Sequence, residues 1–125
     1  MGYQLAMNQA IGFGVLDDQM AAIRDLNRNL EFRKAIKHAI DGKAFAKAMS
    51  KGPFVTVYAG GLARDSAFFD ADATSFFPYN PAGANSILDG LGLMDTDGNG
   101  IRNLANGGGD LVINLVSNKG SDNRV

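Results

Sequence analysis

The chain has 125 residues, the length of one ordinary domain, and its 46% hydrophobic content is sufficient for a core. Twelve Lys and Arg residues against 13 Asp and Glu residues give a formal net charge of -1, which argues against nucleic acid as a partner. The absence of cysteine excludes disulfides, thiolate metal ligands and a thiol nucleophile.

The first residues predict a strand. Tyr3, Leu5 and Met7 alternate with polar or small residues, so the chain enters the fold in a strand at once. This is typical of a piece cut from a larger protein. Met1 is not followed by the basic and apolar regions of a signal peptide, and no apolar run approaches the roughly 18 residues of a membrane span. We therefore expect no signal segment in this chain.

Three helices are predicted between residues 17 and 49. Asp17 or Asp18 can cap a short helix that ends near Asn27. Asn29 can cap the next helix, and Asp41 can end that helix with Gly42 and cap a third. The second helix has the clearest apolar stripe, at Phe32, Ala35, Ile36, Ala39 and Ile40.

An irregular segment follows, from residue 54 to residue 79, rich in Phe, Ala, Asp and Gly without a sustained period. Long loops inside a compact domain are often functional. Aromatic rings there could stack on a sugar or line a pocket for a peptide side chain, although core packing explains most of them. We take Tyr58, Phe68 and Phe69 as the candidate ligand-binding residues.

The last third combines one helix, two turns and a strand. Asn80 followed by Pro81 predicts a capped helix that Gly92 closes. Residues 95–100 form a polar turn and residues 107–109 another. The alternation at Leu111, Ile113 and Leu115 predicts a largely buried strand over residues 111–116.

Three of these segments resemble one family. Residues 29–41, NLEFRKAIKHAID, are similar to the "FRxAI…AID" helix of the extracytoplasmic solute-binding proteins of ABC importers, family 5, the oligopeptide, dipeptide and oligosaccharide type. Residues 79–93, YNPAGANSILDGLGL, and residues 95–102, DTDGNGIR, resemble the family's following helix and its "DxDGDGxR" turn. The departures are Asn80 for Asp, Gly83 for Lys or Glu, and Gly42 for Arg. Order and separation fit the family across nearly the whole chain.

The resemblance implies a mixed α/β fold, with helices packed on a small sheet, as in a lobe of a type II periplasmic binding protein. Residues 1–125 are then a single domain, an excised part of one lobe of a two-lobe protein. Such a protein captures an oligopeptide or oligosaccharide by lobe closure, without chemical change. The implied partners are the solute, the remaining lobe and the ABC permease subunits. The implied location is periplasmic, or extracellular and membrane-anchored, and no cofactor is expected.

The alternative is a small structural module stabilised by calcium. Asp95, Asp97, Asn99 and Gly100 occupy positions 1, 3, 5 and 6 of a calcium loop. Position 12 is Asn106, where such loops carry a bidentate Glu. A plain Asp/Asn/Gly turn is therefore the preferred interpretation, and no metal ligands are assigned.

No catalytic residues are assigned, and the chain is not expected to be an enzyme. His38 is the only histidine, and we expect a solvated side chain on the polar side of its helix. For Arg33 we expect a structural role, paired with Glu31 or with another carboxylate.

Overall fold

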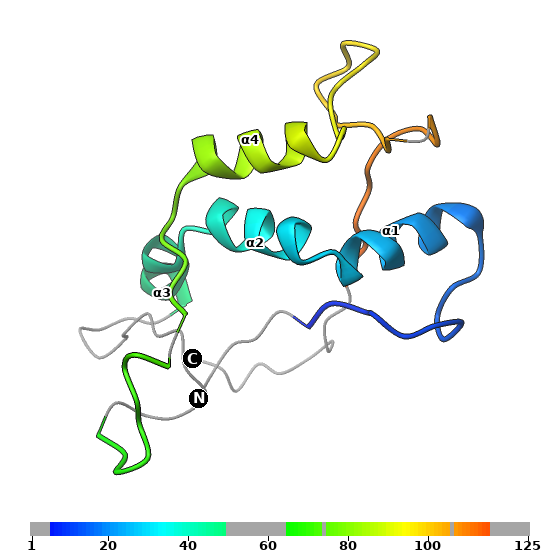
Figure 1. Cartoon of the computed structure of the whole chain (residues 1–125). Coiled ribbons are helices and arrows are strands. Elements are labelled where there is room, and N and C mark those ends of the chain that lie inside the picture. Colours follow the sequence, from blue (N-terminus) through cyan, green and yellow to red (C-terminus); the bar gives the residue numbers. More distant parts are fainter. Residues whose placement is uncertain (1–5, 50–64, 74, 106, 116–125) are drawn as a thin grey trace.

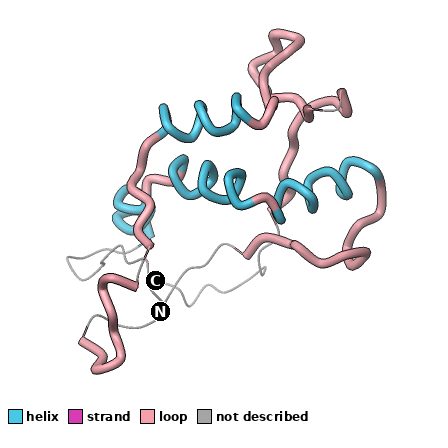
Figure 2. The backbone as a smooth tube through the Cα atoms, in the orientation of Figure 1, coloured by secondary structure: helices cyan, strands magenta, loops and turns pink. Residues whose placement is uncertain are grey.

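The computed structural model describes residues 6–49, 65–73, 75–105 and 107–115. Its helices are α1 (Asp18–Arg28), α2 (Leu30–Ala39), α3 (Gly42–Met49) and α4 (Pro81–Gly90). In Figure 1, α4 lies alongside α2, and α1 leads directly into the start of α2. Turns and irregular segments connect the helices in the described part of the chain, as Figure 2 shows.

The predicted caps at the start of the fold are confirmed. Asp17 precedes α1, and its carboxylate accepts a hydrogen bond of 2.7 Å from the backbone N–H of Met20. Asn29 ends α1 and begins α2, because its own N–H donates to carbonyls of α1 while its side chain accepts from the N–H groups of Glu31 and Phe32. One residue thus satisfies backbone groups of two helices, which fixes the angle between them.

Helix α2 packs against α4 through a narrow apolar seam. Phe32 and Ala35 are fully buried on α2, and Ala84 is buried on α4. Small side chains at two of these positions let the helix backbones come close together. The predicted stripe is confirmed at its centre. It fails at its end, where Ile40 is exposed because α2 stops at Ala39.

Both ends of α4 are fixed by local chemistry. The Asn80 side chain accepts from the N–H of Gly83, and a Cβ on Gly83 would lie only 2.3 Å from Asn80 Nδ2. These two departures from the family pattern therefore fit each other. At the other end Gly92, with φ of +74°, donates to the Asp89 carbonyl while Leu93 donates to the Leu88 carbonyl. These two hydrogen bonds close the helix, and Leu93, which follows directly, is buried in the core.

The prediction of a buried strand over residues 111–116 is wrong for its described part. Residues 111–115 are not a strand, and Leu115 is 77% exposed. A strand exists only where a neighbour pairs with its backbone. In the described residues that pairing is limited to one isolated antiparallel bridge, Asn103 with Asp110, and a 2.6 Å bond from the N–H of Leu111 to the carbonyl of Arg102.

The strand predicted at the start of the chain falls mostly outside the described residues. Its described end, residues 6–8, is not a strand. Within the described ranges, no helix combines the length and the apolar character that a membrane crossing requires.

The α2–α4 seam gives a stability prediction. Phe32→Ala removes a fully buried ring, so the free energy of unfolding should fall by about 3–5 kcal/mol. Phe68→Ala removes the same atoms from a ring that is 84% exposed, so its effect should stay within about 0.5 kcal/mol. Urea unfolding followed by helical circular dichroism measures both. Equal effects of the two substitutions would contradict the seam as described.

Candidate functional site

Two of the three candidate ligand contacts, Phe68 and Phe69, lie in the described part of residues 65–79, which we call the aromatic segment. Phe68 is exposed to solvent and Phe69 is half-buried, while Tyr58 lies outside the described residues. Ser66 shapes the turn, since its hydroxyl accepts from the N–H of Phe68 and its carbonyl accepts from the N–H of Phe69. The ring of Phe68 is thus accessible to a ligand, as a candidate contact must be.

His38 attaches the end of the aromatic segment to α2. Its Nδ1 lies 2.8 Å from the carbonyl oxygen of Pro78, and its own carbonyl accepts from the N–H of Asn80 at 2.8 Å. The imidazole also meets the ring of Phe77 edge to face, with centroids 5.6 Å apart. Because a carbonyl can only accept, Nδ1 carries the proton in this contact. His38 is partly exposed on its helix, and it makes contacts with Pro78 and Phe77 that the expectation of a solvated side chain did not include.

Backbone N–H groups of the Asp95–Gly100 turn donate hydrogen bonds to the carboxylate of Asp95. Asp95 accepts from the N–H of Gly98 at 2.7 Å and from the N–H of Gly100 at 2.9 Å. The hydrogen bond from Gly100 is the main cause that lowers the pKa of Asp95 below its ordinary value of 3.8. The side chain of Asn99 turns inward as well, and its Oδ1 accepts from the N–H of Ile101.

This arrangement bears on the calcium alternative. Among the described residues, no group of three or more His, Cys, Asp or Glu side chains could hold a metal ion. Both carboxylate oxygens of Asp95 accept hydrogen bonds from backbone amides. The calcium-stabilised module is therefore not supported.

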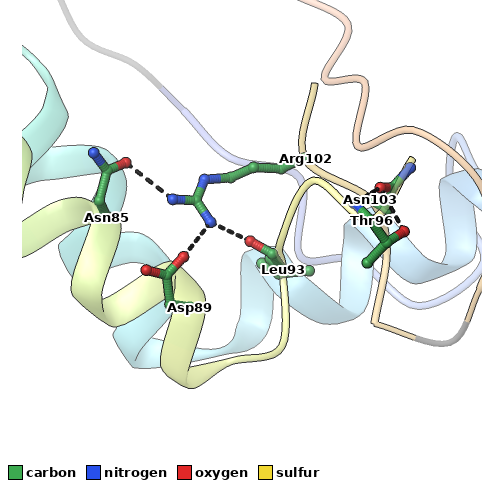
Figure 3. Close-up of polar contacts among 6 residues, drawn as sticks. All are labelled: Asn85, Asp89, Leu93, Thr96, Arg102 and Asn103. Atoms are coloured by element: carbon green, nitrogen blue, oxygen red, sulfur yellow. Dashed lines mark hydrogen bonds and ion pairs between the residues drawn. The ribbon is translucent and has the colours of Figure 1, made fainter. Parts of the chain in front are cut away.

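Asn103 organises the polar region behind the turn. It is buried, and its Oδ1 accepts from both the N–H and the hydroxyl of Thr96, at 2.7 and 2.8 Å (Figure 3). Its Nδ2 donates to Asp110, which also accepts from Asn99 and whose carbonyl accepts from Gln19 of α1. No pattern in the sequence indicates this role of Asn103, because its partners Thr96 and Asp110 are not placed at the regular spacing of a helix or strand.

Arg102 joins the same turn to α4. Its guanidinium donates to the carboxylate of Asp89 at 2.6 Å, to Asn85 at 3.1 Å and to the carbonyl of Leu93 (Figure 3). The planar fork of an arginine suits several fixed acceptors. Thus the arginine of the "DxDGDGxR" pattern has a structural role here, at the end of α4.

Arg33 also has the expected structural role, but with different partners. Its guanidinium donates to the carbonyl of Asn27 at 2.9 Å and to the side chain of Gln9 at 3.5 Å. Glu31 pairs instead with Lys34 at 2.7 Å. Arg33 thus bridges the α1–α2 joint to the segment before α1.

The model of the family described as bacterial extracellular solute-binding proteins, family 5 Middle, matches residues 1–125. The chain belongs to this family. Members of the family are solute-binding proteins and not enzymes, in agreement with the sequence-based expectation.

Within family 5, the chain is similar to two periplasmic binding proteins. It is 43% identical over 122 residues to the periplasmic alpha-galactoside-binding protein of Rhizobium meliloti strain 1021, over 94% of this chain and 18% of the relative. It also matches the solved structure of the periplasmic binding protein MelB from Agrobacterium fabrum C58 in complex with stachyose, with a TM-score of 0.72 and 39% identity. That match covers 85% of this chain and 16% of MelB.

The chain therefore spans less than a fifth of the length of either relative. Its fold is that of part of a lobe of a mixed α/β periplasmic binding protein, which confirms the predicted fold class. The near absence of strands in the described residues fits a partial lobe.

The Asp95 turn gives a prediction about pH. Since the pKa of folded Asp95 lies below 3.8, the ionised carboxylate stabilises the turn at neutral pH. This stabilisation should be lost as the pH falls from the unfolded value of 3.8 through the lower folded value. Carbon-13 NMR of the Asp95 carboxyl measures the midpoint.

The amide proton of Gly100 should report the same midpoint, because it donates to this carboxylate. In the control, Asp95→Asn, the Gly100 amide should lose that titration. A carboxyl midpoint at or above 3.8 would contradict the hydrogen bonding described.

Proposed function

We propose that this chain is part of one lobe of the receptor subunit of an ABC importer, and that the receptor captures oligosaccharides of the α-galactoside class. The observation that carries the proposal is the 43% identity to an alpha-galactoside-binding protein over 94% of the chain. The likeness to a binding protein in complex with stachyose supports the same class of solute. A peptide ligand has no comparable support among these relatives.

The proposal includes the remaining partners and the location. Two lobes close on the solute and present it to permease subunits, with no chemical change. The receptor is periplasmic, as both relatives are. Tyr58, Phe68 and Phe69 remain the proposed solute contacts, and the exposed ring of Phe68 is of the kind that stacks on sugars.

The chemistry of the described surface suits a neutral ligand. An oligosaccharide needs apolar rings for its C–H faces and polar groups for its hydroxyls, without a matching charge. Exposed rings are present along the aromatic segment, and the net charge of the chain is only -1. A strongly charged solute would favour an opposite field around its site.

Calorimetry on the full-length protein that contains this chain tests the proposal. Stachyose should bind with a Kd in about the micromolar range, and trialanine should not bind. In the same titrations Phe68→Ala should weaken stachyose binding by about tenfold. Its matched control is Phe13→Ala, an exposed ring in the loop before α1. Binding of the peptide but not of stachyose would overturn the proposed solute class.

The isolated 125-residue chain is a second arm of the test. Because closure needs two lobes, this chain alone should bind stachyose at least about 100-fold more weakly than the full-length protein. Comparable affinity in the two would contradict the two-lobe arrangement. A reading frame that does not extend beyond the chain would also contradict it.

A further inference from the structure

The end of the aromatic segment is anchored to two helices. The carbonyl of Pro78 is held by His38 of α2, and the N–H of Asn80 donates to the carbonyl of the same histidine. Asn80 is in turn the cap of α4. Two backbone groups on either side of Tyr79 are thus fixed to a helix that is itself packed in the α2–α4 seam. The N–H of Phe68 donates only two residues away, to Ser66.

Two aromatic rings remain exposed at or next to this anchor. Phe77 turns toward His38 and is half-buried, whereas Phe76 is 61% and Tyr79 is 54% exposed. Pro78 between them has a restricted φ, which reduces the freedom of the backbone further. The result is one exposed ring, Tyr79, between two anchored backbone groups, and a second exposed ring, Phe76, two residues before this anchor.

Such a pair suits a carbohydrate better than an ion or a flat apolar surface. Aromatic side chains offer rigid area with only two rotatable bonds, so that little conformational entropy is lost on binding. The hydroxyl of Tyr79 can both donate to and accept from sugar hydroxyls. Preorganised contacts of this kind raise affinity because the cost of ordering has been met during folding.

We propose that Phe76 and Tyr79 form a stacking platform for the bound oligosaccharide, and that His38 is the positioning residue that holds this platform in place. The proposal rests on the proposed function, because it takes its ligand class from there. It adds two solute contacts, Phe76 and Tyr79, and one positioning residue, His38, to the contacts expected from the sequence. His38 itself touches Pro78 and Phe77 and acts on the sugar only through them.

Stachyose titration of the full-length protein tests the platform. Phe76→Ala and Tyr79→Ala should each weaken binding by about tenfold, and Tyr79→Phe should retain most of the affinity because the ring remains. Phe13→Ala is the matched control, with an exposed phenyl in a loop far along the chain, and it should bind as the wild type does. Melting temperatures of all variants separate a loss of contact from a loss of fold.

A second series tests the positioning role of His38. His38→Ala should weaken stachyose binding by about fivefold, the effect of one hydrogen bond. His38→Asn places an amide donor the same two bonds from Cβ as Nδ1, so it should restore affinity to within about twofold. His38→Gln places its donor one bond farther away and should not restore it. Equal affinities of the Asn and Gln variants would overturn the positioning role.

Footprinting of the wild-type protein by hydroxyl radicals avoids any dependence on variants. Stachyose should reduce oxidation of Phe76 and Tyr79 and leave that of Phe13 unchanged. The platform would be overturned if stachyose bound without this protection, or if the Phe76→Ala and Tyr79→Ala variants bound it with wild-type affinity. Either outcome would leave the proposed function standing. Failure of the wild type to bind stachyose would instead overturn the proposed function, and the platform with it.

Discussion

The close packing of α2 on α4 is the constraint on which the rest of the described structure depends. Ala35 and Ala84 are small, buried residues on the two packed helices, and Phe32 of α2 is fully buried as well. The helices run antiparallel in Figure 1, so the end of α2 meets the start of α4. This is where the carbonyl of His38 receives the N–H of Asn80. A larger residue in the seam would separate both the anchor of the aromatic segment and the polar turn from their supports.

In the polar turn, residues with the spacing of calcium ligands accept hydrogen bonds from the backbone of the turn. Asp95, Asp97 and Asn99 have the spacing of calcium ligands, yet the carboxylate of Asp95 accepts from the amides of Gly98 and Gly100. Backbone N–H groups that converge on a carboxylate stabilise its charge much as a cation does. A glycine-rich loop can therefore keep an acidic pattern without a metal, provided that its amides point inward.

What could be predicted from the sequence was local. The caps Asp17, Asn29 and Asn80 act within three residues of themselves, so their side chains identify the helix starts directly. The contact of His38 with Pro78 spans 40 residues, and nothing in the helix pattern indicates it. The strand over residues 111–115 failed for a related reason, since alternation describes side chains while a strand needs a paired backbone.

A segment that packs permanently against another part of a protein differs from a segment that binds a ligand, because only the first has a partner during folding. Val112, Ile113 and Leu115 are exposed apolar residues, and a segment that stays with a neighbour can be ordered by that neighbour during folding. A solute that must be captured and released cannot serve in this way, because the cost of ordering the site would reduce the affinity at every capture. The wall of such a site has to be fixed beforehand by the protein. Tyr79 meets this condition, because the hydrogen bonds of Pro78 and Asn80 to His38 hold the backbone on both sides of it, and Phe76 stands two residues before this anchor.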